Sequence, residues 1–156
     1  MTEFDLIEVR LLRFPLGLWQ QSQEHVDELL REFALIAQAE EEHASVPRRL
    51  LNLVAELTAT YAGLSTPTEQ VRDDAIARGD DEIDLVYRTP REAAGAVRHL
   101  GEMLDEADRY CRQGSHLLTL QTPPDQVAFR RWFLSEFLNQ YEGAAPVPWP
   151  DAASPG

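Results

Sequence analysis

The chain has 156 residues, with 14 arginines, no lysine, 27 acidic residues and one cysteine, and its net charge is −13 at pH 7. This charge excludes a protein whose main role is to coat DNA, RNA or an anionic membrane, because phosphate binding needs clustered positive charge. The lack of lysine excludes a Schiff-base enzyme and a P-loop nucleotide site, and the single cysteine excludes an internal disulfide framework and a cysteine-based zinc site.

The predicted elements follow from apolar residues at three- and four-residue spacing in the helices and from short apolar runs in the strands. In chain order, the sequence predicts a strand over 6–14, helices over 16–42, 47–62 and 67–78, a strand over 83–88, a helix over 90–113, a strand over 116–120 and a helix over 123–142. Residues 144–156 form a proline-rich tail, which favours an extended or polyproline-like conformation.

Three of the helix starts share one local pattern, in which proline and then an acidic residue follow a threonine. The pattern begins at Thr66, Thr89 and Thr122. A threonine can cap the helix, proline suits the first helical position, and an acidic side chain interacts favourably with the helix dipole. We therefore predict that these helices begin at the pattern, with the threonine as the cap.

The two halves of the chain resemble each other. Residues 25–32 read HVDELLRE and residues 99–106 read HLGEMLDE, and the second helix of each half ends in a Tyr-x-Gly sequence. We interpret this as a divergent tandem repeat over about 5–63 and 82–143, joined by an acidic segment over 64–81, with chance similarity between amphipathic helices as the alternative. The predicted fold is a single α+β domain over 1–143 that is mostly helical, with two related strand-helix-helix halves around a small sheet.

Each long helix carries a histidine and two glutamates on one side, which are His25, Glu28 and Glu32 in the first half and His99, Glu102 and Glu106 in the second. Such residues form di-metal sites in helical bundles when they point inward. Here the helical wheel places the glutamates away from the apolar stripe. We expect solvated acidic faces without a metal or other cofactor, and a metal site on these residues is the alternative.

The last predicted helix has a second apolar stripe opposite its main one, interleaved with arginines. Aromatic and arginine side chains together are typical of interface hot spots. The alternatives are a central helix in which Arg130 is paired with an acid, and a tail whose tryptophan folds back on the body. The candidate partner-binding residues are Phe129, Arg130, Arg131, Trp132, Phe133 and Trp149.

Residues 69–84 contain seven acidic residues and two arginines. A strong negative field accelerates encounter with a basic partner, although acidic faces also keep small proteins soluble. The residues predicted to steer such a partner are Asp73, Asp74, Asp80, Asp81 and Glu82.

Two segments carry a resemblance to known proteins, EHVDELLREFAL at 24–35 and VAFRRWFLSEF at 127–137. They resemble small acidic actinobacterial proteins of unassigned function, to which the chain is similar over nearly its whole length. Those proteins are associated with partner-switching regulators, the anti-sigma factors of the ATP-binding serine-kinase type and their antagonists. The chain lacks the Asn-bearing magnesium motif and the Asp-x-Gly-x-Gly nucleotide motif of the kinases, so the resemblance implies regulation by binding, without ATP and without catalytic residues.

We therefore predict a non-enzymatic regulatory protein that acts by protein–protein interaction in sigma-factor or stress signalling. Its partner would be a basic protein such as a DNA-binding regulator. We expect the protein itself to have no direct contact with nucleic acid or membrane, and the sequence leaves open whether it forms a homodimer. The alternative function is binding of a metal or small ligand on the His/Glu faces or in a cleft between the halves. We see no secretory signal and no apolar run that could span a bilayer, so we expect a cytoplasmic protein.

Overall fold

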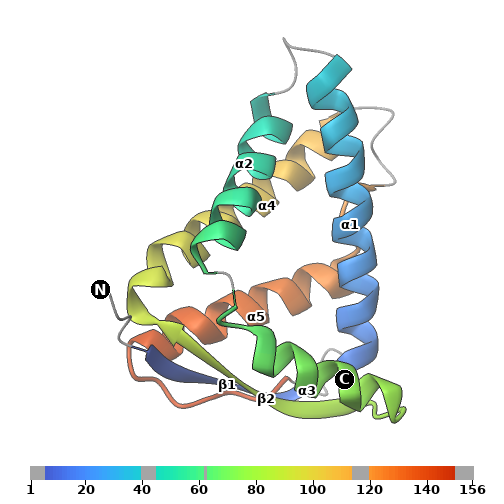
Figure 1. The fold of residues 1–156 in the computed structure, drawn as a ribbon. Coiled ribbons are helices and arrows are strands. Elements are labelled where there is room, and N and C mark those ends of the chain that lie inside the picture. The colour runs from blue at the N-terminus through green and yellow to red at the C-terminus, as the bar shows by residue number, and fades with distance from the viewer. Residues whose placement is uncertain (1–5, 40–44, 62, 114–119, 150–156) are drawn as a thin grey trace.

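The computed structural model describes residues 6–39, 45–61, 63–113 and 120–149. In chain order the elements are β1 (Leu6–Pro15), α1 (Leu16–Ala39), α2 (Ser45–Thr60), α3 (Thr66–Ala77), β2 (Glu82–Pro90), the 3₁₀ turn η1 (Arg91–Ala93), α4 (Ala94–Gln113) and α5 (Pro124–Tyr141). The prediction of a mostly helical α+β fold is confirmed (Figure 1). Most of the strand predicted over 116–120 lies outside the described residues.

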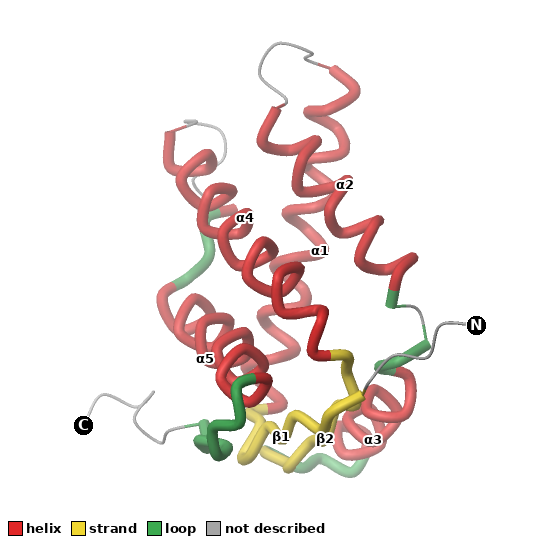
Figure 2. The backbone as a smooth tube through the Cα atoms, turned by 90° about the vertical axis from the view of Figure 1, so that its left-hand side faces the viewer, coloured by secondary structure: helices red, strands yellow, loops and turns green. Residues whose placement is uncertain are grey.

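β1 and β2 pair in an antiparallel sheet, in which Leu6 lies opposite Pro90 and Leu11 opposite Leu85. The side chains of β2 alternate, so that Leu85 is buried and its neighbours Asp84 and Val86 are exposed, as in a strand with one face on the core. The sheet lies at the base of the molecule, flanked by α3 on one side and α5 on the other (Figure 2).

A β-bulge between Leu11 and Phe14 changes the direction of the side chains along β1. At the bulge Arg13 has a φ of 56°, and its backbone N–H donates a 2.8 Å hydrogen bond to Oδ1 of Asp84. A bulge shifts the alternation of a strand by one residue. This shift allows Leu11 and Phe14, three positions apart, both to be fully buried.

Two side chains and one backbone N–H satisfy backbone groups on the two outer edges of the sheet. On β1, the Gln140 amide accepts from the N–H of Arg10 and donates to its carbonyl, both at 2.8 Å, and the N–H of Trp149 donates to the carbonyl of Leu12 at 2.9 Å. On β2, the Thr68 hydroxyl donates to the carbonyl of Val86 at 2.5 Å. These contacts protect the edges from pairing with another strand.

The buried side chains of the described residues form two clusters. The cluster beside the sheet consists of Val9, Leu11, Phe14, Leu16, Ala75, Leu85, Ala93, Phe129, Phe137 and Tyr141. The cluster between α1, α2 and α4 consists of Leu29, Phe33, Leu50, Leu53, Met103, Ala107, Cys111 and Leu120. The helices α1, α2 and α4 are therefore packed on each other, and the cluster beside the sheet joins α5 to β1 and β2.

The two halves share the order strand, long helix, second helix, and their strands pair with each other. Their packing differs, because α5 contacts β1 whereas the helix beside β2 is α3, from the joining segment. The interpretation as a tandem repeat, and the division at 5–63 and 82–143, stay predictions.

The Thr-Pro pattern marks the helix starts, but the prediction that the threonines cap them is wrong. No side-chain capping bond is present at the starts of α3, η1 or α5. Two of the threonines bond elsewhere, because Thr89 contacts the Tyr141 hydroxyl and Thr122 contacts Asp108. The helices predicted over 67–78 and 123–142 end at Ala77 and Tyr141, and Gly79 and Gly143 follow them with φ of 82° and 92°, in the left-handed region that favours glycine.

Candidate functional site

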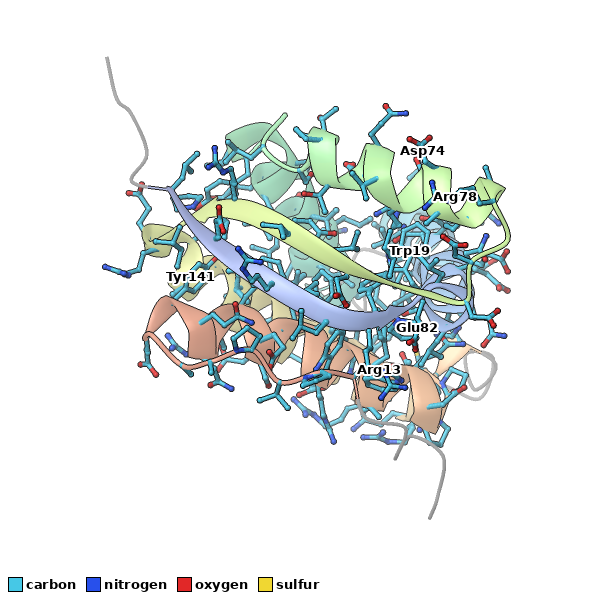
Figure 3. The ribbon with its side chains drawn as sticks, turned by 90° about the horizontal axis from the view of Figure 1, so that it is seen from below. Arg13, Trp19, Asp74, Arg78, Glu82 and Tyr141 are labelled. Carbon is cyan, nitrogen blue, oxygen red and sulfur yellow. The ribbon has the colours of Figure 1, made fainter. Side chains whose placement is uncertain are left out.

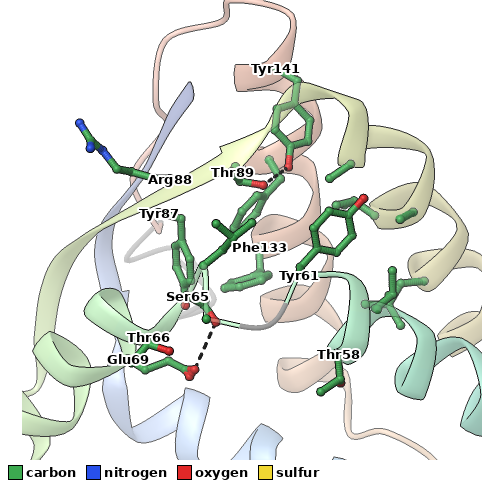
Figure 4. Close-up of a pocket in the computed structure, with 18 residues that line it drawn as sticks. Thr58, Tyr61, Ser65, Thr66, Glu69, Tyr87, Arg88, Thr89, Phe133 and Tyr141 are labelled. Atoms are coloured by element: carbon green, nitrogen blue, oxygen red, sulfur yellow. Dashed lines mark hydrogen bonds between the residues drawn. The ribbon is translucent and has the colours of Figure 1, made fainter. Parts of the chain in front are cut away.

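A pocket of about 610 Å³, here called the tyrosine pocket, lies between the end of α2, the start of α3, β2, α4 and α5 (Figure 4). It is lined by Leu57, Thr58, Tyr61, Gly63, Leu64, Ser65, Thr66, Glu69, Tyr87, Arg88, Thr89, Ala93, Ala96, Val97, Leu100, Phe133, Phe137 and Tyr141. Its volume falls in the range of small-molecule sites in proteins.

The apolar wall of the tyrosine pocket comes from α4 and α5. Val97 and Leu100 are three residues apart on α4, and Phe133 and Phe137 are four apart on α5, so each pair lies on one helix face. The Phe133 and Phe137 rings have centroids 5.1 Å apart, and Tyr87 contacts both rings from β2. Ala96 on α4 is small, which leaves space in front of this wall.

Three of the four tyrosines of the chain line this pocket. Tyr61 follows α2, Tyr87 points inward from β2, and Tyr141 is the last residue of α5. The Tyr141 hydroxyl lies 2.9 Å from Oγ1 of Thr89, the next inward residue of β2 (Figure 4). The pocket therefore combines an aromatic wall with several hydroxyl groups.

The pKa of two of these phenols is raised by their surroundings. Burial raises the pKa of Tyr87, and the nearby Arg72, which also hydrogen-bonds to it, offsets only part of this effect. Burial likewise raises the pKa of Tyr141, and the hydrogen bond to Thr89 acts in the opposite direction. Both phenols are neutral at physiological pH, so they offer hydrogen bonds without charge.

The charged residues that line the tyrosine pocket have opposite signs. Glu69 accepts a 3.2 Å hydrogen bond from the Ser65 hydroxyl, as Figure 4 shows. Arg88 is exposed and forms a 3.7 Å ion pair with Glu8 across the strands. Neither a strongly anionic nor a strongly cationic ligand is favoured by this arrangement.

The predicted partner-binding aromatics form a cluster with the tail and β1. This aromatic cluster consists of Phe14, Phe129, Trp132, Phe133 and Trp149. Phe129 is only 4% exposed, and the indole N–H of Trp132 donates to the carbonyl of Val147 at 2.9 Å. Trp149 therefore lies as the fold-back alternative expects, against Phe129 and Trp132.

Arg130 is held inside the molecule, as the central-helix alternative expects. Its Nη2 lies 2.8 Å from Oδ1 of Asp105 and 3.0 Å from Oδ2 of Asp108. Asp108, which is buried, also accepts hydrogen bonds from the backbone N–H and the hydroxyl of Thr122. Arg131, the next residue, is exposed.

The acidic residues predicted to steer a partner lie on α3 and on the turn into β2. All five, Asp73, Asp74, Asp80, Asp81 and Glu82, are exposed. Arg72, Arg78 and Arg13 contact Asp73, Asp80 and Glu82 respectively. Figure 3 shows this end of the molecule, with Asp74 on α3, Arg78 directly after the end of α3, and Glu82 beside Arg13 on the sheet. We call these five residues the acidic surface.

The structure does not bring the histidines and glutamates of the two long helices together. Nε2 of His25 is buried, whereas Glu28 and Glu32 are exposed on the same helix. His99 and Glu102 form an exposed 4.0 Å contact, and Glu106 pairs with Arg49. Within the described ranges, no group of three or more His, Cys, Asp or Glu side chains is placed to hold a metal ion.

The comparisons with known proteins found no matching family model, no matching curated protein and no matching solved structure. The resemblance to actinobacterial regulators therefore stays a prediction. Of the helices that the structure describes, none combines the length and the apolar character that a membrane-spanning segment requires.

The tyrosine pocket was not predicted from the sequence, although two of its residues lie in a motif that the sequence shows. The Tyr-x-Gly sequences at the ends of the second helices supply Tyr61 and Tyr141, which both line the pocket. As a local pattern, this motif indicates a repeat and does not indicate a pocket. Tyr87 and Thr89 share the inward face of β2 and could have been grouped with them from strand alternation.

Proposed function

We propose that this protein binds a small, mostly apolar molecule in the tyrosine pocket. The observation that carries the proposal is the combination of an aromatic wall from Phe133 and Phe137 with the hydroxyls of Tyr61, Tyr87 and Tyr141. Binding sites for small molecules are mostly apolar, with a few polar groups that orient the ligand. This corresponds to the alternative of a ligand-binding cleft between the halves.

The lining residues favour an uncharged ligand with a flat ring system and one or two hydroxyl or carbonyl groups. Rings pack on Phe133 and Phe137 in offset or edge-to-face geometry, while neutral tyrosine and threonine hydroxyls can donate or accept hydrogen bonds. Glu69 and Arg88 carry opposite charges, so the ligand needs no net charge.

A neutral fluorescent probe, N-phenyl-1-naphthylamine, tests the proposal directly. We expect saturable binding with increased probe fluorescence, and loss of most of that binding in Ala96→Phe, because the added ring occupies the pocket. Ala128→Phe is the matched control, since Ala128 is exposed on α5 and the same substitution there leaves the pocket open. Thermal unfolding of each variant shows whether it is folded.

Two results would contradict the proposal. One is probe binding that is equal in the parent protein, Ala96→Phe and Ala128→Phe, which would place the probe elsewhere. The other is the lack of saturable binding of the probe by folded parent protein.

A basic protein partner is a second candidate function, supported by the exposure of all five residues of the acidic surface. Exposed charges of one sign raise the rate of encounter with an oppositely charged protein, and salt weakens this effect. Protein captured from the host should therefore dissociate as salt is raised, and the Asp73→Asn, Asp74→Asn, Asp81→Asn triple variant should capture less of it. Capture that is indifferent to both changes would exclude this role for the acidic surface.

A further inference from the structure

A second pocket, of about 310 Å³, lies between α1, α4 and α5, with Val54 of α2 at its side. We call it the histidine pocket. Leu100 and Phe133 line both this pocket and the tyrosine pocket, and thus stand between the two. Its other apolar residues include Val26, Leu29, Leu30, Leu104, Phe129 and Leu134.

Two buried polar atoms belong to residues that line the histidine pocket. Nε2 of His25 and Oε1 of Gln126 are inaccessible to solvent and have no hydrogen-bond partner among the described residues. The whole Gln126 residue is only 8% exposed. A buried polar atom without a partner costs free energy, and more than nine-tenths of such atoms in proteins have one.

The remaining charged group of the pocket is already neutralised. Arg130 lines the histidine pocket, but its guanidinium bonds to Asp105 and Asp108. An anionic ligand would have to compete with two carboxylates for this arginine. The pocket therefore suits an uncharged molecule.

We propose that the histidine pocket binds a small apolar molecule that carries one hydroxyl group, a phenol or an alcohol. An amide oxygen only accepts hydrogen bonds, whereas a neutral imidazole nitrogen can donate when it carries the proton. A hydroxyl can donate to Oε1 of Gln126 or accept from the His25 N–H, so a hydroxyl that reaches either atom supplies the partner that it lacks. The volume is about twice that of a 150 Å³ protein cavity known to admit benzene, so a substituted single ring fits.

Titration with para-cresol and toluene, which differ only by the hydroxyl, tests this inference by ligand-observed NMR. We expect para-cresol to bind the parent protein saturably and about tenfold more tightly than toluene, since a buried hydrogen bond is added. Gln126→Met and His25→Leu should each reduce this preference while leaving toluene binding in place. Neither variant should lose thermal stability, because each removes an unpartnered polar atom and keeps the apolar volume.

Matched controls are available at exposed positions. Gln70→Met on α3 and His99→Leu on α4 make the same chemical changes outside the histidine pocket, and they should keep the full preference for para-cresol. The preference should also persist in Ala96→Phe, because that substitution fills only the tyrosine pocket. This arm separates failure of this inference from failure of the proposed function.

Four results would overturn the inference. The first is equal affinity of the parent protein for para-cresol and toluene. The second is no saturable binding of either molecule, which would mean that Gln126 and His25 bind water only. The third is loss of para-cresol binding in Ala96→Phe, and the fourth is its full retention in both Gln126→Met and His25→Leu. Either of these two results places the probe outside the histidine pocket.

Discussion

Asp108 shows how a single buried carboxylate determines the position of a whole helix. It accepts hydrogen bonds from the backbone N–H and the hydroxyl of Thr122 just before α5, and it pairs with Arg130 one turn and a half into that helix. Both charged side chains are largely buried, with exposures of 7% for Asp108 and 13% for Arg130. The pair fixes α5 against α4, and with it the wall of the tyrosine pocket.

Removing Asp108 leaves the largely buried Arg130 with the partly exposed Asp105 as its remaining carboxylate partner among the described residues, and it removes the acceptor of the Thr122 N–H. We therefore expect Asp108→Ala to lower the free energy of unfolding by about 3 kcal/mol, measured by chemical denaturation. Asp105→Ala is the control, since Asp105 contacts the same arginine but is 43% exposed, and it should cost about 1 kcal/mol or less. Equal losses in the two variants would show that burial of Asp108 is unimportant.

Ionisation of the Cys111 thiol makes the free energy of unfolding depend on pH in the alkaline range. Burial, with a smaller contribution from Asp108, raises the pKa of the Cys111 thiol from 9.0 to about 11. Between these values the unfolded chain loses a proton that the folded chain retains, so the free energy of unfolding falls as pH rises from 9 to 11. Below pH 9 the thiol is protonated in both states and has no such effect.

Denaturation of the parent protein and Cys111→Ala over this pH range measures the contribution of the thiol. The variant should be less stable at every pH because of the lost side-chain volume, but its stability should decline less between pH 9 and 11. Tyr87 and Tyr141, whose pKa values are also raised, should keep some decline above pH 10 in both proteins. Parallel curves over the whole range would contradict the raised pKa of Cys111.

At the scale of elements, the tail acts as part of the fold. Trp149 contacts Phe129 and Trp132, with ring centroids 5.9 and 5.4 Å away. Its backbone N–H donates to the carbonyl of Leu12 on the outer edge of β1. The backbone of Val147 bonds to the Trp132 indole and to the buried Glu136 carboxylate. The tail thus covers aromatic residues that the sequence alone presents as a partner surface.

Truncation of Trp149 should therefore destabilise the protein. We expect Trp149→Ala to lower the free energy of unfolding by about 2 kcal/mol, because a half-buried aromatic side chain is lost. Val147→Ala should change it by less than about 0.5 kcal/mol, since that side chain is 57% exposed and both backbone bonds remain. If Trp149→Ala were as stable as Val147→Ala, the tail would not be part of the folded unit.

The elements were predictable because their signals are local. Apolar spacing and the Thr-Pro pattern predicted each described helix, and short apolar runs predicted β1 and β2. The bulge at Arg13, the bonds of Gln140 to β1 and the bonds of Thr89 and Thr122 were not predicted. Each joins residues that are far apart in the chain, such as Arg10 and Gln140, and no local pattern specifies such a pair.

At the scale of the whole molecule, the predicted class was right and the candidate site was missed. A pocket depends on how α2, α4, α5 and the sheet are placed in space, which no periodicity in one element reveals. Aromatic residues on α5 were noted, but they face the tail, the sheet and the tyrosine pocket at once. Which aromatic residue of α5 contacts the tail, the sheet or the pocket is determined by the tertiary packing of the elements and not by the sequence of α5.

The four tyrosines allow the most direct test of the tyrosine pocket. Tyr61, Tyr87 and Tyr141 line it, whereas Tyr110 packs edge-on against Phe33 in the other core cluster, with centroids 5.6 Å apart. In protein labelled with ¹³C at the tyrosine rings, titration with N-phenyl-1-naphthylamine should shift the signals of Tyr61, Tyr87 and Tyr141 together with one affinity. The Tyr110 signal should stay in place. Shifts of all four tyrosines alike, or of Tyr110 alone, would contradict a ligand site in the tyrosine pocket.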